Sequence, residues 1–272
     1  MINLNSDASL IDGFEEWLFH QEKSPNTIHT YKSAIQKLSY WLEERNLSLG
    51  MLNHSSIQNY MNELEAEGKS ASTIDKIYAT IRVFAQFLEH PAMADNIKRK
   101  EKEKNIYQTI PEFLKEDERT KLLKDVEKDK DIRNTTIVHM LLYTGVRLTE
   151  LCNLDRSDIN INGQIGTVTI TNPQGDKKRI VPIPKDALKV LKNYLETLPK
   201  DYEGPLFISK QNNRLTTRSI QYMLEKYEMN PHKLRHTFCR DLIEKGLDIA
   251  VVAQLAGHND INITKRYLIN VE

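Results

Sequence analysis

PHKLRHTFCR, residues 231–240, is the stretch of this 272-residue chain on which its interpretation depends. His232 and Arg235 are three residues apart, and His236 is four residues from His232. On a helix these spacings place the side chains on or near one face, one turn from each other. The stretch therefore predicts a helix that carries a guanidinium group beside two imidazoles.

Two more motifs follow towards the end of the chain. Gly257 and His258 come after an apolar helical run, and Gly257 is placed to end that helix. Tyr267 lies nine residues after His258, beyond a polar loop expected at 259–262. A tyrosine with a free hydroxyl thus follows the histidine and arginine motif.

Arginine, histidine and tyrosine together suit chemistry at phosphorus. Guanidinium groups recognise phosphate in a planar, bidentate way, and histidine donates hydrogen bonds or moves protons near neutral pH. A tyrosine hydroxyl has an unperturbed pKa of about 10, so it needs cations or a base beside it to act as a nucleophile. The set predicts phosphoryl transfer with Tyr267 as the nucleophile.

A phosphodiester has two non-bridging oxygens, so this chemistry predicts a second arginine elsewhere. LLYTGVRLTELCNL, residues 141–154, supplies Arg147 at the start of a predicted helix, directly after a turn at Gly145. Glu150 lies three residues further on, where it could orient Arg147 or be an ordinary charge on the helix surface. The sequence leaves both interpretations of Glu150 open.

The ordered motifs TGVRLTEL at 144–151, HKLRH at 232–236, LAGH at 255–258 and Tyr267 closely resemble those of the tyrosine recombinases, or phage integrase family. The resemblance covers nearly the whole chain, and four separated motifs in order are more specific than any one alone. The short chain is most similar to resolvase-type, Xer-like members. The resemblance implies a site-specific recombinase, here for resolving or integrating a mobile element.

The resemblance also implies a mechanism without metal, ATP or other cofactor. Tyr267 attacks the scissile phosphate, forms a 3′-phosphotyrosyl bond and frees a 5′ hydroxyl, and a partner strand reverses the step. Strand exchange through a Holliday junction in a homotetramer is implied in the same way, with a dimer on each inverted-repeat core site of double-stranded DNA. The residues expected to hold the phosphate are Arg147, His232, Arg235 and His258.

In the family, the general acid that protonates the leaving 5′ oxygen is usually a lysine on a β-hairpin. Alternating runs at 166–171 and 178–183 predict that hairpin here, with turn residues between them. Gln174 stands where the family has its lysine, directly before the turn glycine. Lys177 is therefore the expected general acid, with Lys178 as the alternative.

The rest of the chain predicts a mainly α fold with this small hairpin. Helical periodicity at about 9–22, 27–45, 55–67 and 70–90 indicates a four-helix bundle that resembles the family's core-binding domain. Residues 91–110 carry the charge run at 98–104 and are expected to link it to a catalytic domain at 111–272. The resemblance implies that the two domains form a C-shaped clamp on DNA. Residues expected to contact DNA are Thr27, Tyr31, Lys32, Ser72, Lys178, Arg218 and Gln221.

Composition limits the classes of protein to which this chain can belong. The formal net charge is zero, whereas nucleic-acid-binding domains are often basic, so composition alone does not predict DNA binding. The net value nevertheless hides local basic runs. No run of eighteen apolar residues and no secretory signal are seen, so a cytoplasmic protein without a membrane span is expected. Cys152 and Cys239 lie in apolar helical patterns and show no metal-ligand spacing, so we expect both to be buried.

The same motifs are compatible with other functions. A type IB topoisomerase-like nicking enzyme would share the site but not exchange strands, and a DNA-binding architectural protein would have a dead site. A metal-dependent hydrolase is disfavoured because an acidic ligand cluster is missing. His232 and His236 have the spacing of a zinc pair, but Lys233 replaces the glutamate of that motif. We expect His236 to support the site structurally.

Overall fold

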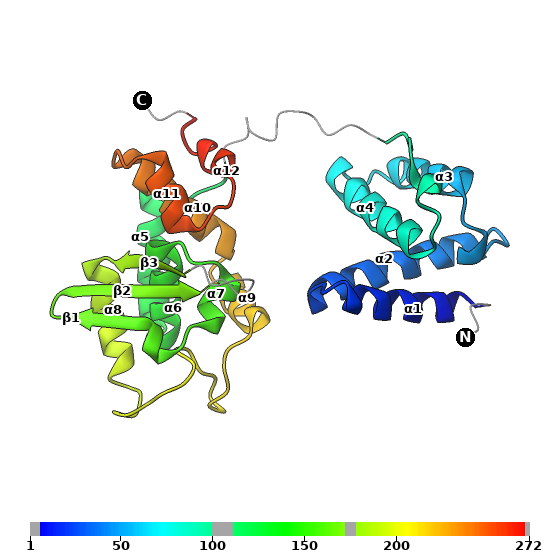
Figure 1. Ribbon diagram of the computed structural model, residues 1–272. Coiled ribbons are helices and arrows are strands. Elements are labelled where there is room, and N and C mark those ends of the chain that lie inside the picture. The colour runs from blue at the N-terminus through cyan, green and yellow to red at the C-terminus, as the bar shows by residue number, and fades with distance from the viewer. Residues whose placement is uncertain (1–5, 100–110, 172–177, 270–272) are drawn as a thin grey trace. The chain divides into compact units, whose positions relative to one another are not determined.

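The computed structural model describes residues 6–99, 111–171 and 178–269. The chain divides into two compact units, which meet in sequence at residues 104 and 105. Each unit encloses its own buried hydrophobic cluster. Figure 1 shows the helices and strands of each unit.

The N-terminal unit is the expected four-helix bundle, drawn from blue to cyan in Figure 1. Phe14, Leu38 and Phe84 are fully buried at its centre, and the Phe14 and Phe84 rings meet edge to face with centroids 5.1 Å apart. Its core extends through Ile97, beyond the limit expected at residue 90. The elements are α1 (Asp7–His20), α2 (Pro25–Glu43), η1 (Leu49–Met51), α3 (His54–Ala66), α4 (Ala71–Phe87) and η2 (Pro91–Ala94).

Two helices of this unit begin with the same local signal. The Ser24 hydroxyl accepts a hydrogen bond from the Thr27 N–H at 3.2 Å, and Ser70 does the same for Thr73 at 3.2 Å. Serine is a favoured N-cap because its oxygen satisfies one of the amides that the first helical turn leaves unpaired. The Ser-x-x-Thr pattern therefore sets the first turns of α2 and α4.

The C-terminal unit is mostly helical with one antiparallel sheet in the order β1-β2-β3. The hairpin of β2 and β3 was expected, and Val168 pairs with Val181 in its register. Strand β1 was missed, because four residues with two asparagines give a weak strand signal. The elements are α5 (Glu116–Lys128), α6 (Ile132–Thr144), α7 (Leu148–Asn153), η3 (Arg156–Asp158), β1 (Ile159–Asn162), β2 (Ile165–Thr171), β3 (Lys178–Ile183), α8 (Lys185–Leu195), α9 (Thr217–Glu225), α10 (Pro231–Glu244), α11 (Ile249–Ala256) and α12 (Ile261–Lys265).

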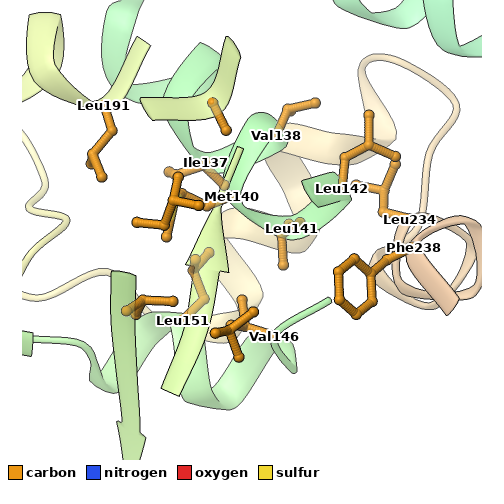
Figure 2. Close-up of a cluster of buried hydrophobic side chains, with 14 of the residues drawn as sticks. Ile137, Val138, Met140, Leu141, Leu142, Val146, Leu151, Leu191, Leu234 and Phe238 are labelled. Atoms are coloured by element: carbon orange, nitrogen blue, oxygen red, sulfur yellow. The ribbon is translucent and has the colours of Figure 1, made fainter. Parts of the chain in front are cut away.

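Helix α6 forms the centre of this unit, as the mostly apolar stretch at 137–142 predicts. Figure 2 shows Ile137, Met140 and Leu141 of α6 in one cluster with Leu191 of α8 and Phe238 of α10. The side chains of Ile137, Met140 and Leu141 are fully buried. The packing places the end of α6, where the TGVR motif begins, against α10.

The last segment differs from expectation in one detail. A polar loop was expected at 259–262, but α12 already begins at Ile261, capped by the Asp260 side chain, which accepts from the Asn262 N–H. Gly257 ends α11 in the left-handed conformation with φ of 69°, as predicted. The turn between α11 and α12 is therefore short, and it holds His258. Among the described residues no helix is long and apolar enough to span a membrane.

Candidate active site

Arg147 is positioned by a tight turn. Gly145 ends α6 with φ of 59°, and a Cβ there would lie 2.1 Å from Phe238 Cδ1, so this turn requires glycine. Arg147 then becomes the N-cap residue of α7. Its guanidinium donates to Glu150 Oε1 at 3.0 Å and to the Gly257 carbonyl at 2.5 Å. Its side chain is 44% exposed, so it remains accessible to a ligand.

Glu150 is buried beneath this arginine and is not a helix-surface charge. Arg179 donates to both of its oxygens, at 2.9 and 2.7 Å, and the Arg147 N–H donates to Oε2 at 2.7 Å. Burial alone would raise the pKa of the Glu150 carboxyl, but the hydrogen bonds from Arg179 and Arg147 outweigh it and the pKa is lowered. Glu150 therefore stays ionised and orients Arg147.

Arg179 was missed as a site residue by sequence reasoning. Its Nε donates to the Leu255 carbonyl at 3.0 Å, and a Cβ on Gly257 would lie 2.7 Å from its Nη1. The guanidinium of Arg179 thus packs against the backbone of Gly257, where a side chain would collide with it. The signal was available, because alternation along β3 places Arg179 on the same face as Val181 and Ile183, which are buried.

Arg235 is buried on α10 and is held by main-chain carbonyls. It donates to the Gly145 carbonyl and, at 2.5 Å, to the Ala256 carbonyl. Burial, with repulsion from Arg147, lowers the pKa of the Arg235 guanidinium to about 10. It is therefore still a cation at neutral pH, and it lies near enough to Arg147 for the two charges to repel each other.

A cleft of about 330 Å³ opens beside these arginines. His232, Arg147 and Arg235 line it, and Gln221 of α9 lines it as well. Arg147 is the N-cap residue of α7, and the two other basic side chains come from α10, at least eighty-five positions later in the sequence. The structure thus brings together residues that the sequence placed in separate motifs. The complete lining is Val146, Arg147, Leu148, Thr149, Thr217, Gln221, Pro231, His232 and Arg235.

His258 lies in the turn after α11. Its Nδ1 is 2.8 Å from the Thr264 hydroxyl, and its ring lies nearly parallel to that of Tyr267, with centroids 6.5 Å apart. Burial, together with the charges of Arg235 and Arg147, lowers the pKa of His258 to about 4. The imidazole is therefore neutral at neutral pH and has an N–H to donate.

Tyr267 follows α12 and points into the protein. Its side chain is 1% exposed, and its hydroxyl lies 2.5 Å from His236 Nδ1. Arg240 fixes the backbone here, donating to the Tyr267 carbonyl at 3.1 Å. Burial, and then the nearby Cys239 thiol, raise the pKa of the Tyr267 hydroxyl above its ordinary value. The tyrosine is therefore protonated in this structure.

The remaining predicted residues lie elsewhere. Lys177 lies outside the described residues, as does Gln174, while Lys178 is exposed at the start of β3. Arg218 is exposed on α9, next to the cleft-lining Thr217. Contact of Lys178, Arg218 or Gln221 with DNA stays a prediction.

Four predicted DNA contacts belong to the N-terminal unit. Ser72 is exposed in the first turn of α4, and Thr27 lies in the first turn of α2. Tyr31 packs partly against the bundle core. Lys32 forms ion pairs with Asp12 at 3.2 Å and Glu15 at 2.5 Å, so it is less available to phosphate than the other three.

Over the described ranges, no three His, Cys, Asp or Glu residues gather as a metal site. Cys152 and Cys239 are free and buried, as expected. The groups described in this region are Arg147, Arg235, three histidines and the Tyr267 hydroxyl, with Glu150 and Arg179 supporting Arg147.

Known proteins resemble this chain over most of its length. Residues 112–271 match the phage integrase family, and residues 11–91 match the phage integrase N-terminal SAM-like domain. The chain is 29% identical to tyrosine recombinase XerA of Thermococcus kodakarensis, over 97% of this chain and 92% of that protein. It is 31% identical to the TnP I resolvase of Bacillus thuringiensis, over 93% of each. A crystal structure of XerH bound to its difH substrate before cleavage shares the fold, with a TM-score of 0.68 and 20% identity, over 88% of this chain and 75% of that one.

Proposed function

The chain belongs to the phage integrase family of tyrosine recombinases, and from this premise we propose that its DNA-cleaving site consists of Arg147, His232, Arg235, His258 and Tyr267. The protein is a site-specific recombinase that cuts and rejoins DNA through a tyrosine. One observation supports the site above others. Two arginines converge on one cleft, although eighty-eight positions separate them in sequence, and the tyrosine hydroxyl is hydrogen-bonded to His236, whose ring neighbours that of the cleft-lining His232.

The arginines bind the scissile phosphate and stabilise its transition state. Arg147 and Arg235 each face the 330 Å³ cleft, where they contact the two non-bridging oxygens. His232 and neutral His258 donate hydrogen bonds to the same oxygens as negative charge builds up. Because the guanidinium groups are fixed beforehand by Glu150 and by carbonyls, little reorganisation is required when the phosphate arrives.

Tyr267 then attacks the phosphorus. A bond forms between its oxygen and phosphorus, the bond to the 5′ oxygen breaks, and the protein becomes attached to the 3′ end. The 5′ oxygen leaves as a hydroxyl, with a proton from Lys177 or Lys178 on the hairpin. The covalent bond conserves the energy of the phosphodiester, so a 5′ hydroxyl from a partner strand can reverse the step without ATP.

The partner in this reaction is double-stranded DNA with a core site of inverted repeats. We propose that one protomer binds each half-site, so that each core site holds a dimer. Two such sites then meet in a tetramer, in which strands are exchanged through a Holliday junction. The N-terminal bundle binds the same DNA, with Thr27 and Ser72 at the helix starts near phosphates. The protein works where such DNA is found, in the cytoplasm.

The proposal is tested with a nicked suicide duplex. Its sequence is selected from a random DNA pool by binding to the protein, and a nick near the cleavage point lets the 5′ fragment diffuse away. Wild-type protein should form an adduct that survives denaturation and persists in EDTA. Tyr267→Phe should form none while it still binds the duplex, because it has no hydroxyl to attack with.

A matched control is Tyr40→Phe, which removes the hydroxyl of an exposed tyrosine in the N-terminal unit. It should form the adduct at the wild-type rate. If Tyr267→Phe formed an adduct, or if the bound wild-type protein formed none, the cleavage site would be wrongly assigned. Lys177→Ala and Lys178→Ala, compared on normal and 5′-thiolate leaving groups, identify the acid, because a thiolate leaves without one.

A further inference from the structure

The attack by Tyr267 releases a proton whose destination the proposed site leaves open. Within the described part of the chain, the hydroxyl has hydrogen-bond contacts with His236 and Cys239, both on α10. The His236 contact is a 2.5 Å hydrogen bond to Nδ1, and the two ring centroids are 5.7 Å apart. Cys239 lies almost one helical turn further along α10.

We propose that His236 is a catalytic residue that accepts the proton of Tyr267 through Nδ1 as the tyrosine attacks the phosphate. The O–H bond of Tyr267 breaks, an N–H bond forms on His236, and the ring becomes an imidazolium. In the rejoining step the same proton returns to the tyrosine oxygen as it leaves phosphorus. This inference rests on the proposed role of Tyr267.

Geometry argues against His258 for this task, and protonation argues against Cys239. The His258 ring lies nearly parallel to the Tyr267 ring, at an angle of 6°, and its Nδ1 is bound to Thr264. Burial raises the pKa of the Cys239 thiol to about 11, so it is protonated and a weak acceptor. His236 is the nitrogen base in hydrogen-bond contact with the hydroxyl.

The position of His236 also connects the tyrosine to the cleft. Its ring centroid is 6.3 Å from that of His232, which lines the cleft one helical turn away. A proton acceptor at this point lies between the buried hydroxyl and the place where the phosphate binds. A short displacement of Tyr267 towards the cleft would therefore keep the imidazole within reach.

The electrostatic surroundings set the protonation of His236. Burial, then His232, Arg266 and Arg235, lower the pKa of the imidazole to about 4, and Glu112 opposes them. His236 is therefore neutral at neutral pH, as an acceptor must be. A phosphate entering the cleft adds negative charge near the same arginine, which raises the pKa of His236 and makes it a stronger base.

The test separates proton transfer from positioning. His236→Asn can place an amide oxygen near the site of Nδ1, so it keeps a hydrogen-bond acceptor but lacks a base. Single-turnover adduct formation on the nicked duplex should slow by about 100-fold or more, within the range for lost general-base catalysis. The exposed His20→Asn in the N-terminal unit is the matched control and should cleave like wild type.

The decisive measurement replaces Tyr267 with a fluorinated tyrosine, whose more acidic hydroxyl depends less on a base. The rate ratio between wild type and His236→Asn should shrink markedly with this nucleophile. If His236 only anchored Tyr267, the rate ratio would be unchanged. If His236 only held Tyr267 in an inactive buried position, His236→Asn would cleave faster than wild type. Either result would overturn the proposal.

Two further controls keep the outcomes distinct. DNA binding and thermal unfolding of His236→Asn show whether it is folded, and His236→Gln serves as a second variant if it is not. If Tyr267→Phe lacks the adduct while His236→Asn and His236→Gln cleave like wild type, only the proton-acceptor role fails. If Tyr267→Phe still forms the adduct, the proposed function fails with it.

Discussion

Arg147 and Arg235 carry similar charges in different surroundings. Arg235 is 7% exposed and bound to carbonyls, whereas the Arg147 side chain is 44% exposed. Burying a charged group is costly unless it is paired and hydrogen-bonded, which explains why Arg235 has two carbonyl partners. Arg147 is instead fixed by Glu150 and stays open to the cleft. The buried arginine is thus rigid, and the exposed one can meet DNA.

Arg179 is expected to act through Glu150 on Arg147. Arg179→Met removes the bidentate partner of a buried carboxylate, so Glu150 should turn away and Arg147 should be misplaced. Adduct formation on the nicked duplex should slow by about 100-fold, the usual effect of a misplacement near 1 Å. Arg179→Lys should restore only part of the rate, because lysine lacks the planar fork of two donors.

The control for this variant is Arg133→Met, which removes another partly buried arginine of the same unit. Its guanidinium donates to the Ile208 carbonyl, away from the residues of the cleft. Arg133→Met should bind and cleave DNA at close to the wild-type rate. Equal losses in the two variants would show that Arg179 matters for folding alone.

At the scale of elements, the join between α6 and α7 determines where Arg147 lies. Gly145 ends α6 in the left-handed conformation and packs against Phe238 of α10. The same glycine presents its carbonyl to Arg235. One residue thus ends a helix, permits close packing and orients the second arginine.

Gly145→Ala should be strongly destabilising. The left-handed conformation costs a non-glycine residue about 1–2 kcal/mol, and the clash with Phe238 adds overpacking strain of about 1–3 kcal/mol. Gly163→Ala is the matched control, because it has the same φ of 59° but no atom within 4 Å of the new Cβ. Urea unfolding should show a clearly larger loss for Gly145→Ala. Similar losses would mean that Phe238 moves aside without cost.

At the scale of the whole molecule, the two hydrophobic clusters predict separate folding. The N-terminal cluster includes Phe14, Ile35 and Leu38, all fully buried within that unit. A fragment of residues 1–104 should therefore fold alone and unfold cooperatively in urea. Circular dichroism with a helical spectrum but no sigmoidal transition would contradict this expectation.

Stability should fall as pH falls from about 6.5 towards 4. His236 and His258 have ordinary pKa values of 6.5, and burial lowers both to about 4 in the folded protein. In this window the unfolded chain binds protons that the folded chain does not, so acid favours unfolding. The thermal midpoint of wild type should drop between pH 7 and pH 5. The double variant His236→Asn and His258→Asn should lose much of this dependence, and an equal drop in both proteins would exclude these histidines as its cause.

The sequence alone predicted most of the helices and the side chains that are candidates for the reaction. Periodic apolar residues and capping signals such as Ser24 and Gly257 are local features, so the bounds of α2 could be predicted within two residues and the end of α11 at Gly257. The spacing of His232, Arg235 and Tyr267 indicated the chemistry in the same way. The assignment of these residues to catalysis is a proposal that the suicide duplex tests.

Only the tertiary structure decided how those groups are paired. Glu150 could be a surface charge or a support for Arg147 until β3 brought Arg179, twenty-nine positions away, onto its carboxylate. The contact between His236 and Tyr267 joins residues thirty-one apart, and no local pattern encodes it. Periodicity reports which face of an element is buried, whereas the partner on that face depends on how separate elements pack.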